Sequence, residues 1–231
     1  LRKKKEKIDF CIVGEPTNPN KLGEMIKIGR RGSISGSIII SGSQGHVAYP
    51  HLSNNPINTL VKICKKLNEQ KLDKGNKNFQ PSNLEFTSIN VDNKAHNVIP
   101  AKARAQFNIR YNNLHTASSL KKKINKIVKN LCKKNKCIFK IEYLVNGDSF
   151  LTKPEKTIFM AKKIIKKITK INPKFSTTGG TSDARFIKKI APCLEFGLVN
   201  KTMHKVDECV SVSDLKKLTD IYKNILIEYF K

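Results

Sequence analysis

Tryptophan is absent from this 231-residue chain, and acidic side chains are scarce beside basic ones. Asp and Glu number 18 against 45 Lys and Arg, which gives a formal net charge of +27, and only 6 of the basic residues are Arg. Such a balance suggests a nucleic-acid or anionic-membrane partner. The lysines, however, are scattered over predicted helix surfaces without the aromatic residues of a base-stacking platform. We therefore expect no nucleic acid and no membrane as partners, and interpret the lysine-rich segments as solvated helix faces.

Long apolar runs and paired cysteine motifs are also missing. No apolar stretch approaches the roughly 20 residues of a membrane-spanning helix, and the opening "LRKKKEKIDF" lacks the apolar region of a secretory signal. The six cysteines complete no zinc knuckle and are typical of reduced thiols in the cytosol. We expect a soluble, cytoplasmic protein. Because the chain begins with Leu rather than Met, we also expect sequence to be missing upstream.

The middle of the chain alternates strand and helix patterns. Apolar residues at helical spacing predict helices over about residues 56–70 and 117–134, and strand patterns surround them in "SISGSIIISGS", "NLEFTSINV", "ARAQFNIRY" and "CIFKIEYLV". The resulting order, β-α-β-β-α-β, is that of the ferredoxin-like split βαβ fold, in which both helices cover one face of an antiparallel sheet. This segment is expected to fold as its own domain.

The flanking segments have an α/β pattern. The apolar run "IDFCIVGEP" predicts a buried strand before the middle domain, and a helix over residues 154–170, the strand "PCLEFGLV" and a helix over residues 213–229 follow it. The sequence therefore predicts an α/β domain interrupted by an inserted split-βαβ domain. We place the divisions at residues 1–31, 32–144 and 145–231.

Three loops place a potential metal ligand or proton carrier after a predicted strand, where open α/β sheets hold their sites. They are "VGEPT" with Glu15, "STTGGTSDARF" with Asp183 and "NKTMHKVDE" with His204. A fourth segment, "GSQGHVAYPHLSNNP", carries His46 and His51 between Gly and Pro residues. Taken alone, these histidines are compatible with metal binding, with acid–base chemistry or with a structural role at a helix start.

Taken together, "GRRGS", "GHVAYPH", "HNVIPAKARAQFNIR" and "TTGGTSDARF" in this order resemble the bacterial succinyl-diaminopimelate desuccinylases. That family is part of a di-zinc metallopeptidase superfamily with acetylornithine deacetylases, aminoacylases and carboxypeptidases of the G2 type. The resemblance covers essentially the whole chain and corresponds to the C-terminal part of the family. It implies an α/β zinc-peptidase catalytic domain, incomplete here, that is interrupted by an inserted ferredoxin-like dimerisation domain.

The same resemblance implies a cytoplasmic homodimer with two zinc ions per complete subunit, cobalt being possible. The implied reaction is hydrolysis of a small-molecule substrate, N-succinyl-diaminopimelate, to succinate and diaminopimelate for lysine and peptidoglycan precursors. The general base and several metal ligands of the family would lie upstream of Leu1, so this chain alone is not expected to be active. Two alternatives are a related deacylase, such as one acting on acetylornithine, and an inactive truncated dimerisation fragment.

The residue roles implied by the resemblance fall into three groups. Glu15 and His204 match metal ligands, and His46 matches the residue that stabilises the oxyanion in the partner subunit's active site. His51 and His96 match no such role, and His96 stands where relatives usually have Asn. Because a guanidinium grips a carboxylate better than an ammonium does, the few arginines of this lysine-rich chain are candidates for carboxylate binding, although an ordinary surface role is about as frequent for any one of them. The matched substrate-binding positions are Arg30, Ser33, Asn97, Arg110, Thr177 and Asn200.

Overall fold

The computed structural model describes residues 6–231, and the chain divides into two compact units. Among the described residues, unit 1 comprises residues 6–31 with Phe150–Lys231, and unit 2 comprises Gly32–Ser149. The expected division placed the second boundary at residue 144, whereas strand β9 (Ile138–Gly147) continues past that point. The strand is longer than expected because its ladder with β4 (Gly32–Ser41) continues through an irregularity to the pair of Ser33 and Gly147.

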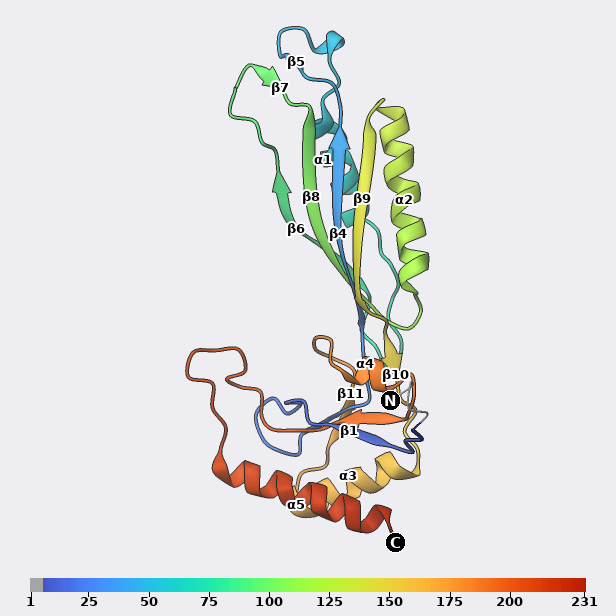
Figure 1. Cartoon of the computed structure of the whole chain (residues 1–231), viewed down its shortest axis with the longest axis vertical. Helices are drawn as coiled ribbons and strands as arrows, with labels where there is room; N and C mark the ends of the chain where they lie inside the picture. Colours follow the sequence, from blue (N-terminus) through green and yellow to red (C-terminus); the bar gives the residue numbers. More distant parts are fainter. Residues whose placement is uncertain (1–5) are drawn as a thin grey trace. The chain divides into compact units, whose positions relative to one another are not determined.

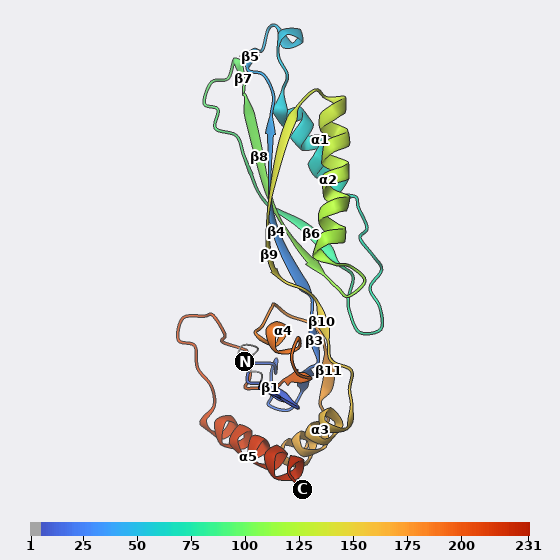
Figure 2. The same cartoon turned by 45° about the vertical axis from the view of Figure 1, so that its right-hand side comes forward.

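Unit 2 has the predicted β-α-β-β-α-β order. Its antiparallel sheet has the strand order β6-β8-β4-β9. The two helices lie on the same face of this sheet, as Figures 1 and 2 show. The remaining elements of this sheet and its helices are β6 (Asn83–Asn90), β8 (Lys102–Tyr111), α1 (Pro56–Asn68) and α2 (Ala117–Lys134).

Buried and exposed residues alternate along the strands of unit 2, so one face of the sheet packs against the two helices. On β8 the odd-numbered residues from Ala103 to Tyr111 are buried in the core beneath the helices. Helix α1 begins with Pro56 after an Asn55 cap, and α2 begins with a capping box between Thr116 and Ser119. The opposite face carries polar residues of β4 and β8 such as Ser35, Gln106 and Asn108.

A small antiparallel pair, β5 (Gly45–His46) with β7 (Val98–Ile99), extends from this sheet. A 3-10 helix, η2 (Pro50–Leu52), follows β5. His46 is the last residue of β5, and Asn97 directly precedes β7, so the strand pair brings the two residues close together.

Unit 1 contains a mixed sheet with the strand order β1-β12-β2-β11. The pairs β1–β12 and β2–β11 are parallel, while β12 meets β2 in the antiparallel sense. The expected α/β class is therefore present, with a sheet that is not wholly parallel. The strands are β1 (Cys11–Val13), β2 (Met25–Lys27), β11 (Lys174–Ser176) and β12 (Cys193–Glu195).

Two helices share one apolar core with this sheet. Buried Ile158 and Ile165 of α3 (Lys156–Thr169) and Ile221 of α5 (Val212–Tyr229) pack together with Ile26 and Phe196. A short helix, α4 (Ala184–Ile187), lies near β12, and β3 (Gly29–Arg30) pairs with β10 (Phe150–Leu151). No helix within residues 6–231 is long and apolar enough to cross a membrane.

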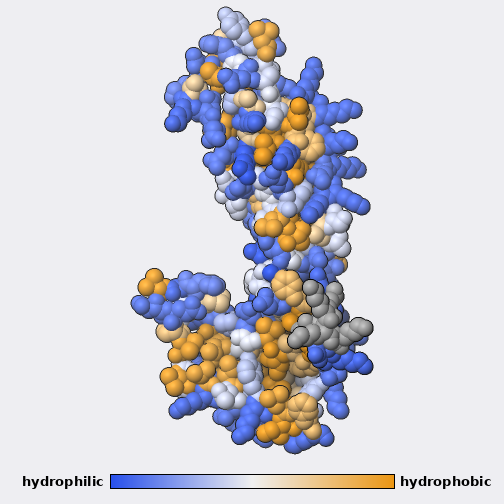
Figure 3. All heavy atoms as spheres, in the orientation of Figure 1, coloured by the Kyte–Doolittle hydropathy of each residue, from blue (hydrophilic) through white to orange (hydrophobic). Residues whose placement is uncertain are grey.

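The exposed surface is hydrophilic around α2 of unit 2 and more apolar on one face of unit 1. Hydrophilic side chains cover the α2 side of unit 2 in Figure 3, whereas apolar residues gather on the visible face of unit 1. An apolar groove of about 530 Å³ lies in unit 1, with Phe10, Tyr222, Leu226 and Phe230 among its lining residues.

Candidate functional site

The four strands of the unit 1 sheet end in one row. Val13 pairs with Glu195, Glu195 with Lys27, and Lys27 with Ser176, and each of the four is the last residue of its strand. Because β12 and β2 are antiparallel, the segments after β1 and β12 leave this row in one direction, and the segments after β2 and β11 leave it in the other. Glu15 and Asn200 follow β1 and β12, whereas Arg30 of β3 and Thr177 follow β2 and β11, so the fold brings these predicted residues together as two pairs.

The loops after β1 and β12 continue to run together beyond the strands. The Asn18 side chain donates to the Gly197 carbonyl at 2.7 Å, and the Asn200 backbone N–H donates to the Asn18 carbonyl at 2.8 Å. The Asn200 side chain also reaches the Pro16 carbonyl at 3.4 Å. Because Pro16 directly follows Glu15, the predicted metal-ligand segment and the predicted substrate-binding Asn200 are neighbours.

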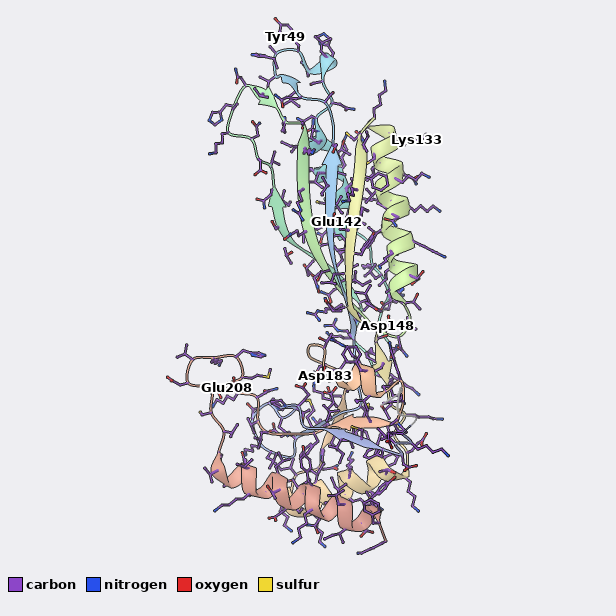
Figure 4. All side chains as sticks on the ribbon, viewed as in Figure 1. Tyr49, Lys133, Glu142, Asp148, Asp183 and Glu208 are labelled. Carbon is purple, nitrogen blue, oxygen red and sulfur yellow. The ribbon has the colours of Figure 1, made fainter. Side chains whose placement is uncertain are left out.

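His204 lies on an exposed loop that leads from Asn200 to helix α5. Thr202 holds this loop together, because its hydroxyl donates to the Cys209 carbonyl at 2.8 Å and accepts from the Cys209 N–H at 3.1 Å. The His204 backbone has a positive φ of 62°, and its N–H donates to Glu208 at 3.3 Å. Figure 4 labels Glu208 on this loop, which projects from the sheet.

The donor set is chemically suited to zinc but incomplete within the described residues. A carboxylate such as Glu15 and an imidazole such as His204 are ordinary ligands of catalytic zinc. Both follow neighbouring parallel strands, which is the arrangement that the sequence predicts. No group of three or more His, Cys, Asp or Glu side chains among residues 6–231 is placed to hold a metal ion. Any metal would therefore need further ligands.

Arg30 and Glu195 form a buried ion pair at the row of strand ends. The exposed fractions of the two residues are 7% and 1%. The Arg30 Nε donates to Glu195 at 2.8 Å, its Nη2 pairs with the same carboxylate oxygen, and Ser182 donates to the other oxygen. Arg30 Nη1 also donates to the Thr178 carbonyl at 3.3 Å. The guanidinium is thus held firmly in this unit.

Lys27 is a second buried cation in this cluster, with an exposed fraction of 6%. Its ammonium donates to the hydroxyls of Thr178 at 2.6 Å and Ser176 at 3.2 Å. Burial first, and then the nearby Arg30 charge, lower the pKa of Lys27 to about 8, while Glu195 partly opposes this shift. Lysine is so common in this chain that Lys27 gave no signal in the sequence. Glu195, an acidic residue inside the apolar run "PCLEFGLV", is a signal that sequence analysis missed.

The neighbouring loop residues have different surroundings. Thr177 is buried at the end of β11. Asp183 is exposed immediately before α4, where Figure 4 labels it. Arg185 lies over the ring of Phe186, with its guanidinium carbon 4.6 Å from the ring centre.

Unit 2 brings Ser33 and Arg110 together on the helix-free face of its sheet. They are directly opposite each other on β4 and β8. The Asn108 side chain donates to the hydroxyls of Ser35 at 3.1 Å and Ser33 at 3.4 Å, which fixes a polar surface beside Arg110. No acceptor among residues 6–231 holds the half-buried Arg110 guanidinium through a hydrogen bond, and it forms no ion pair there. Arg110 is therefore better placed than Arg30 to accept a new carboxylate.

His46 and Asn97 lie next to each other in the β5–β7 segment. His46 pairs with Val98 across the two strands, and the Val47 N–H donates to the Asn97 carbonyl at 3.1 Å. His46 is exposed, and its Nδ1 accepts the Ala48 N–H at 3.1 Å. The rings of His46 and Tyr49 lie 6.0 Å apart, and His51 stands edge-on to Tyr49 at 6.4 Å. His96 is exposed on the same segment.

Comparison with known proteins defines the class of the inserted domain. Residues 28–136 match the peptidase dimerisation domain. The aminopeptidase PepT from Bacillus cereus has the same fold with a TM-score of 0.84 at 18% identity, and the match covers 100% of this chain and 60% of that one. A tripeptidase from Staphylococcus aureus gives a TM-score of 0.79 at 15% identity, over 97% of this chain and 58% of that one. The chain therefore carries the predicted dimerisation domain within a peptidase-like α/β fold, and the predicted fold class is confirmed.

The sequence similarity is more specific. The chain is 69% identical over 230 residues to a succinyl-diaminopimelate desuccinylase of Pelagibacter ubique, covering 100% of this chain and 60% of that protein. It is 51% identical over 221 residues to the protein of the same name from Rickettsia bellii, covering 96% of this chain and 56% of that protein. The resemblance predicted from the motifs is confirmed. The chain spans about 60% of the length of these relatives.

Proposed function

We propose that the complete protein is a metal-dependent amide hydrolase that converts N-succinyl-diaminopimelate and water to succinate and diaminopimelate in the cytoplasm, for lysine and peptidoglycan precursors. The observation that carries this proposal is the 69% identity along the whole chain to a protein named for that activity. Because the chain spans about 60% of that relative, the activity is assigned to a longer protein and not to these 231 residues alone.

Zinc is the metal proposed for this reaction, with two ions per complete subunit and cobalt as a possible substitute. When bound, such ions polarise the substrate carbonyl and acidify the attacking water. Glu15 and His204 would each hold one ion, because they supply a carboxylate and an imidazole from loops that follow the neighbouring strands β1 and β12. The general base and the remaining ligands are expected in the part of the protein outside this chain.

Substrate carboxylates are proposed to bind at two places. Arg110 with Ser33 offers a guanidinium and a hydroxyl on the polar face of unit 2. In unit 1, Arg30 and Thr177 follow β2 and β11, where Arg30 is already paired with Glu195, and Asn200 lies beside Pro16 on the segment after β12. The bidentate geometry of a guanidinium suits a carboxylate. Asn97 is proposed to assist from its position beside His46.

The complete protein is proposed to act as a homodimer, because residues 28–136 match a peptidase dimerisation domain. His46 would then stabilise the oxyanion in the partner subunit's active site. Its exposed position on a loop is compatible with such a role, since the ring is not enclosed by its own unit.

Activity of the complete protein on a substrate panel tests the proposal. We expect succinate release from N-succinyl-diaminopimelate and little turnover of acetylornithine; the reverse preference would reject the proposed substrate. His46→Ala should lower kcat by about 10²–10³-fold, the usual cost of one oxyanion donor, with metal content unchanged. His46→Gln, which keeps an N–H donor, should recover part of that loss. Loss of metal in His46→Ala would instead identify His46 as a ligand.

A further inference from the structure

The backbone around His46 is held from several sides. β5 pairs His46 with Val98, and the Val47 N–H donates to the Asn97 carbonyl at 3.1 Å. The Tyr49 N–H donates to the His46 carbonyl at 3.0 Å, which closes a tight turn. The loop is therefore exposed but ordered by its own hydrogen bonds, and it determines where the His46 ring can point.

The ring itself has one defined contact with the backbone. The Ala48 N–H lies 3.1 Å from the His46 Nδ1 and donates to it. A neutral imidazole carries a single N–H, and the nitrogen that accepts a hydrogen bond must be the one without it. This contact places the proton of the neutral ring on Nε2.

We propose that the Ala48 backbone N–H fixes His46 as the Nε2–H tautomer, so that the loop presents a neutral hydrogen-bond donor at its exposed tip. This inference rests on the proposed oxyanion role, because an oxyanion requires a donor and not a lone pair. If the proton sat on Nδ1, Nε2 would offer a lone pair to a negatively charged oxygen and would repel it. Ala48 is therefore a positioning residue that acts through its main chain.

The same loop provides an internal reference. His51 is also exposed, and its ring stands edge-on to Tyr49 at 6.4 Å. No N–H within the described part of the chain donates to a ring nitrogen of His51, whereas Ala48 donates to His46. Both imidazoles are exposed to solvent and lie near Tyr49. A higher proportion of the Nε2–H tautomer in His46 than in His51 would therefore be attributable to the hydrogen bond from Ala48.

Long-range ¹H–¹⁵N correlation spectra of the ¹⁵N-labelled 231-residue chain test this assignment, recorded at a pH high enough to observe neutral rings. We expect His46 to show an unprotonated Nδ1 and a protonated Nε2, with a higher proportion of this tautomer than His51. Ala48→Pro removes the N–H donor and should lower that proportion toward the His51 value. Ala48→Gly keeps the donor and should leave it unchanged. The amide signals of Val47 and Val98 verify that the β5–β7 pair persists.

Several results would overturn the assignment. A proton on Nδ1 in the unaltered chain would do so without any variant, and so would the same tautomer proportion in His46 and His51. An unchanged proportion in Ala48→Pro with the β5–β7 signals retained would show that the Ala48 N–H is not the cause.

Activity of the complete protein separates this inference from the oxyanion role. The kcat of Ala48→Pro should fall toward that of His46→Ala, and by much more than the kcat of Ala48→Gly, which keeps the N–H donor. If His46→Ala keeps full turnover while the spectra show the expected tautomer, the oxyanion role fails and the tautomer assignment stands. If His46→Ala is inactive but the spectra show a proton on Nδ1, the tautomer assignment fails alone.

Discussion

Lys27 carries its ammonium group into a buried position at the end of strand β2. Its hydrogen-bond partners are the hydroxyls of Ser176 and Thr178. Burial, reinforced by the Arg30 charge, lowers the pKa of Lys27 to about 8 from the ordinary 10.5. Hydroxyl partners therefore do not fully replace the water that the ammonium loses, and the charged form weakens unit 1.

The pH dependence of stability should reveal this weakness. Between about pH 8 and 10.5 the unfolded chain binds more protons at Lys27 than the folded chain, so the free energy of unfolding rises with pH across that window. Urea unfolding at about pH 7.5 and about pH 10 should show the unaltered chain gaining roughly 1–3 kcal/mol relative to Lys27→Met. Parallel pH profiles for the two chains would contradict the depressed pKa.

The buried ion pair of Arg30 and Glu195 should contribute to the stability of unit 1. Glu195→Gln leaves the Arg30 charge buried without its carboxylate, which should cost about 3–5 kcal/mol of unfolding free energy in urea denaturation. The exposed pair of Lys65 and Glu69 is the control, since Glu69→Gln should cost less than about 1 kcal/mol. Equal costs for the two substitutions would show that the Glu195 pair is not effectively buried.

At the scale of elements, Tyr111 joins the end of β8 to the end of β9. Its hydroxyl donates to Asp148 at 2.8 Å and reaches the Gly147 carbonyl at 3.2 Å, and its ring is fully buried. Tyr111→Phe should therefore lower the unfolding free energy of unit 2 by about 1–3 kcal/mol. Tyr143→Phe removes an exposed contact with Asn125 and should cost less. Urea denaturation of both variants measures the two losses. A larger loss of unfolding free energy in Tyr143→Phe than in Tyr111→Phe would contradict this ranking.

The elements that sequence analysis could predict are those with a local signal. The helical spacing of apolar residues over 117–134 corresponds to α2, and the alternation in β8 corresponds to its buried and exposed faces. The strand predicted in "PCLEFGLV" corresponds to β12, but the pairing of the three-residue strands β2, β11 and β12 has no local signal, because it joins segments about 150 residues apart, such as Lys27 and Ser176. The mixed order of that sheet therefore required the structure.

The candidate residues show the same limit. Motifs pointed to Glu15, His46 and His204, but no local pattern indicates that Arg30 is paired with Glu195 or that Ala48 contacts the His46 ring. Both contacts depend on backbone geometry or on residues far along the chain. Sequence can thus nominate the groups that carry chemistry, whereas their protonation and partners come from the fold.

At the scale of the whole molecule, the chain combines a segment that matches a peptidase dimerisation domain with an α/β unit. The matching segment is residues 28–136, and the chain as a whole spans about 60% of its desuccinylase relatives. Within residues 6–231 no three His, Cys, Asp or Glu side chains are grouped closely enough to hold a metal ion. The proposed metal binding by Glu15 and His204 therefore requires further ligands from outside the described residues.

Metal content and turnover of the complete protein test the central claim most directly. The variants are Glu15→Ala, His204→Ala and, as a control, His96→Ala, which removes an exposed imidazole outside the proposed ligand set. We predict that Glu15→Ala and His204→Ala each lose bound zinc and release almost no succinate from N-succinyl-diaminopimelate, while His96→Ala retains its zinc. Full zinc occupancy together with undiminished succinate release in both ligand variants would contradict the account.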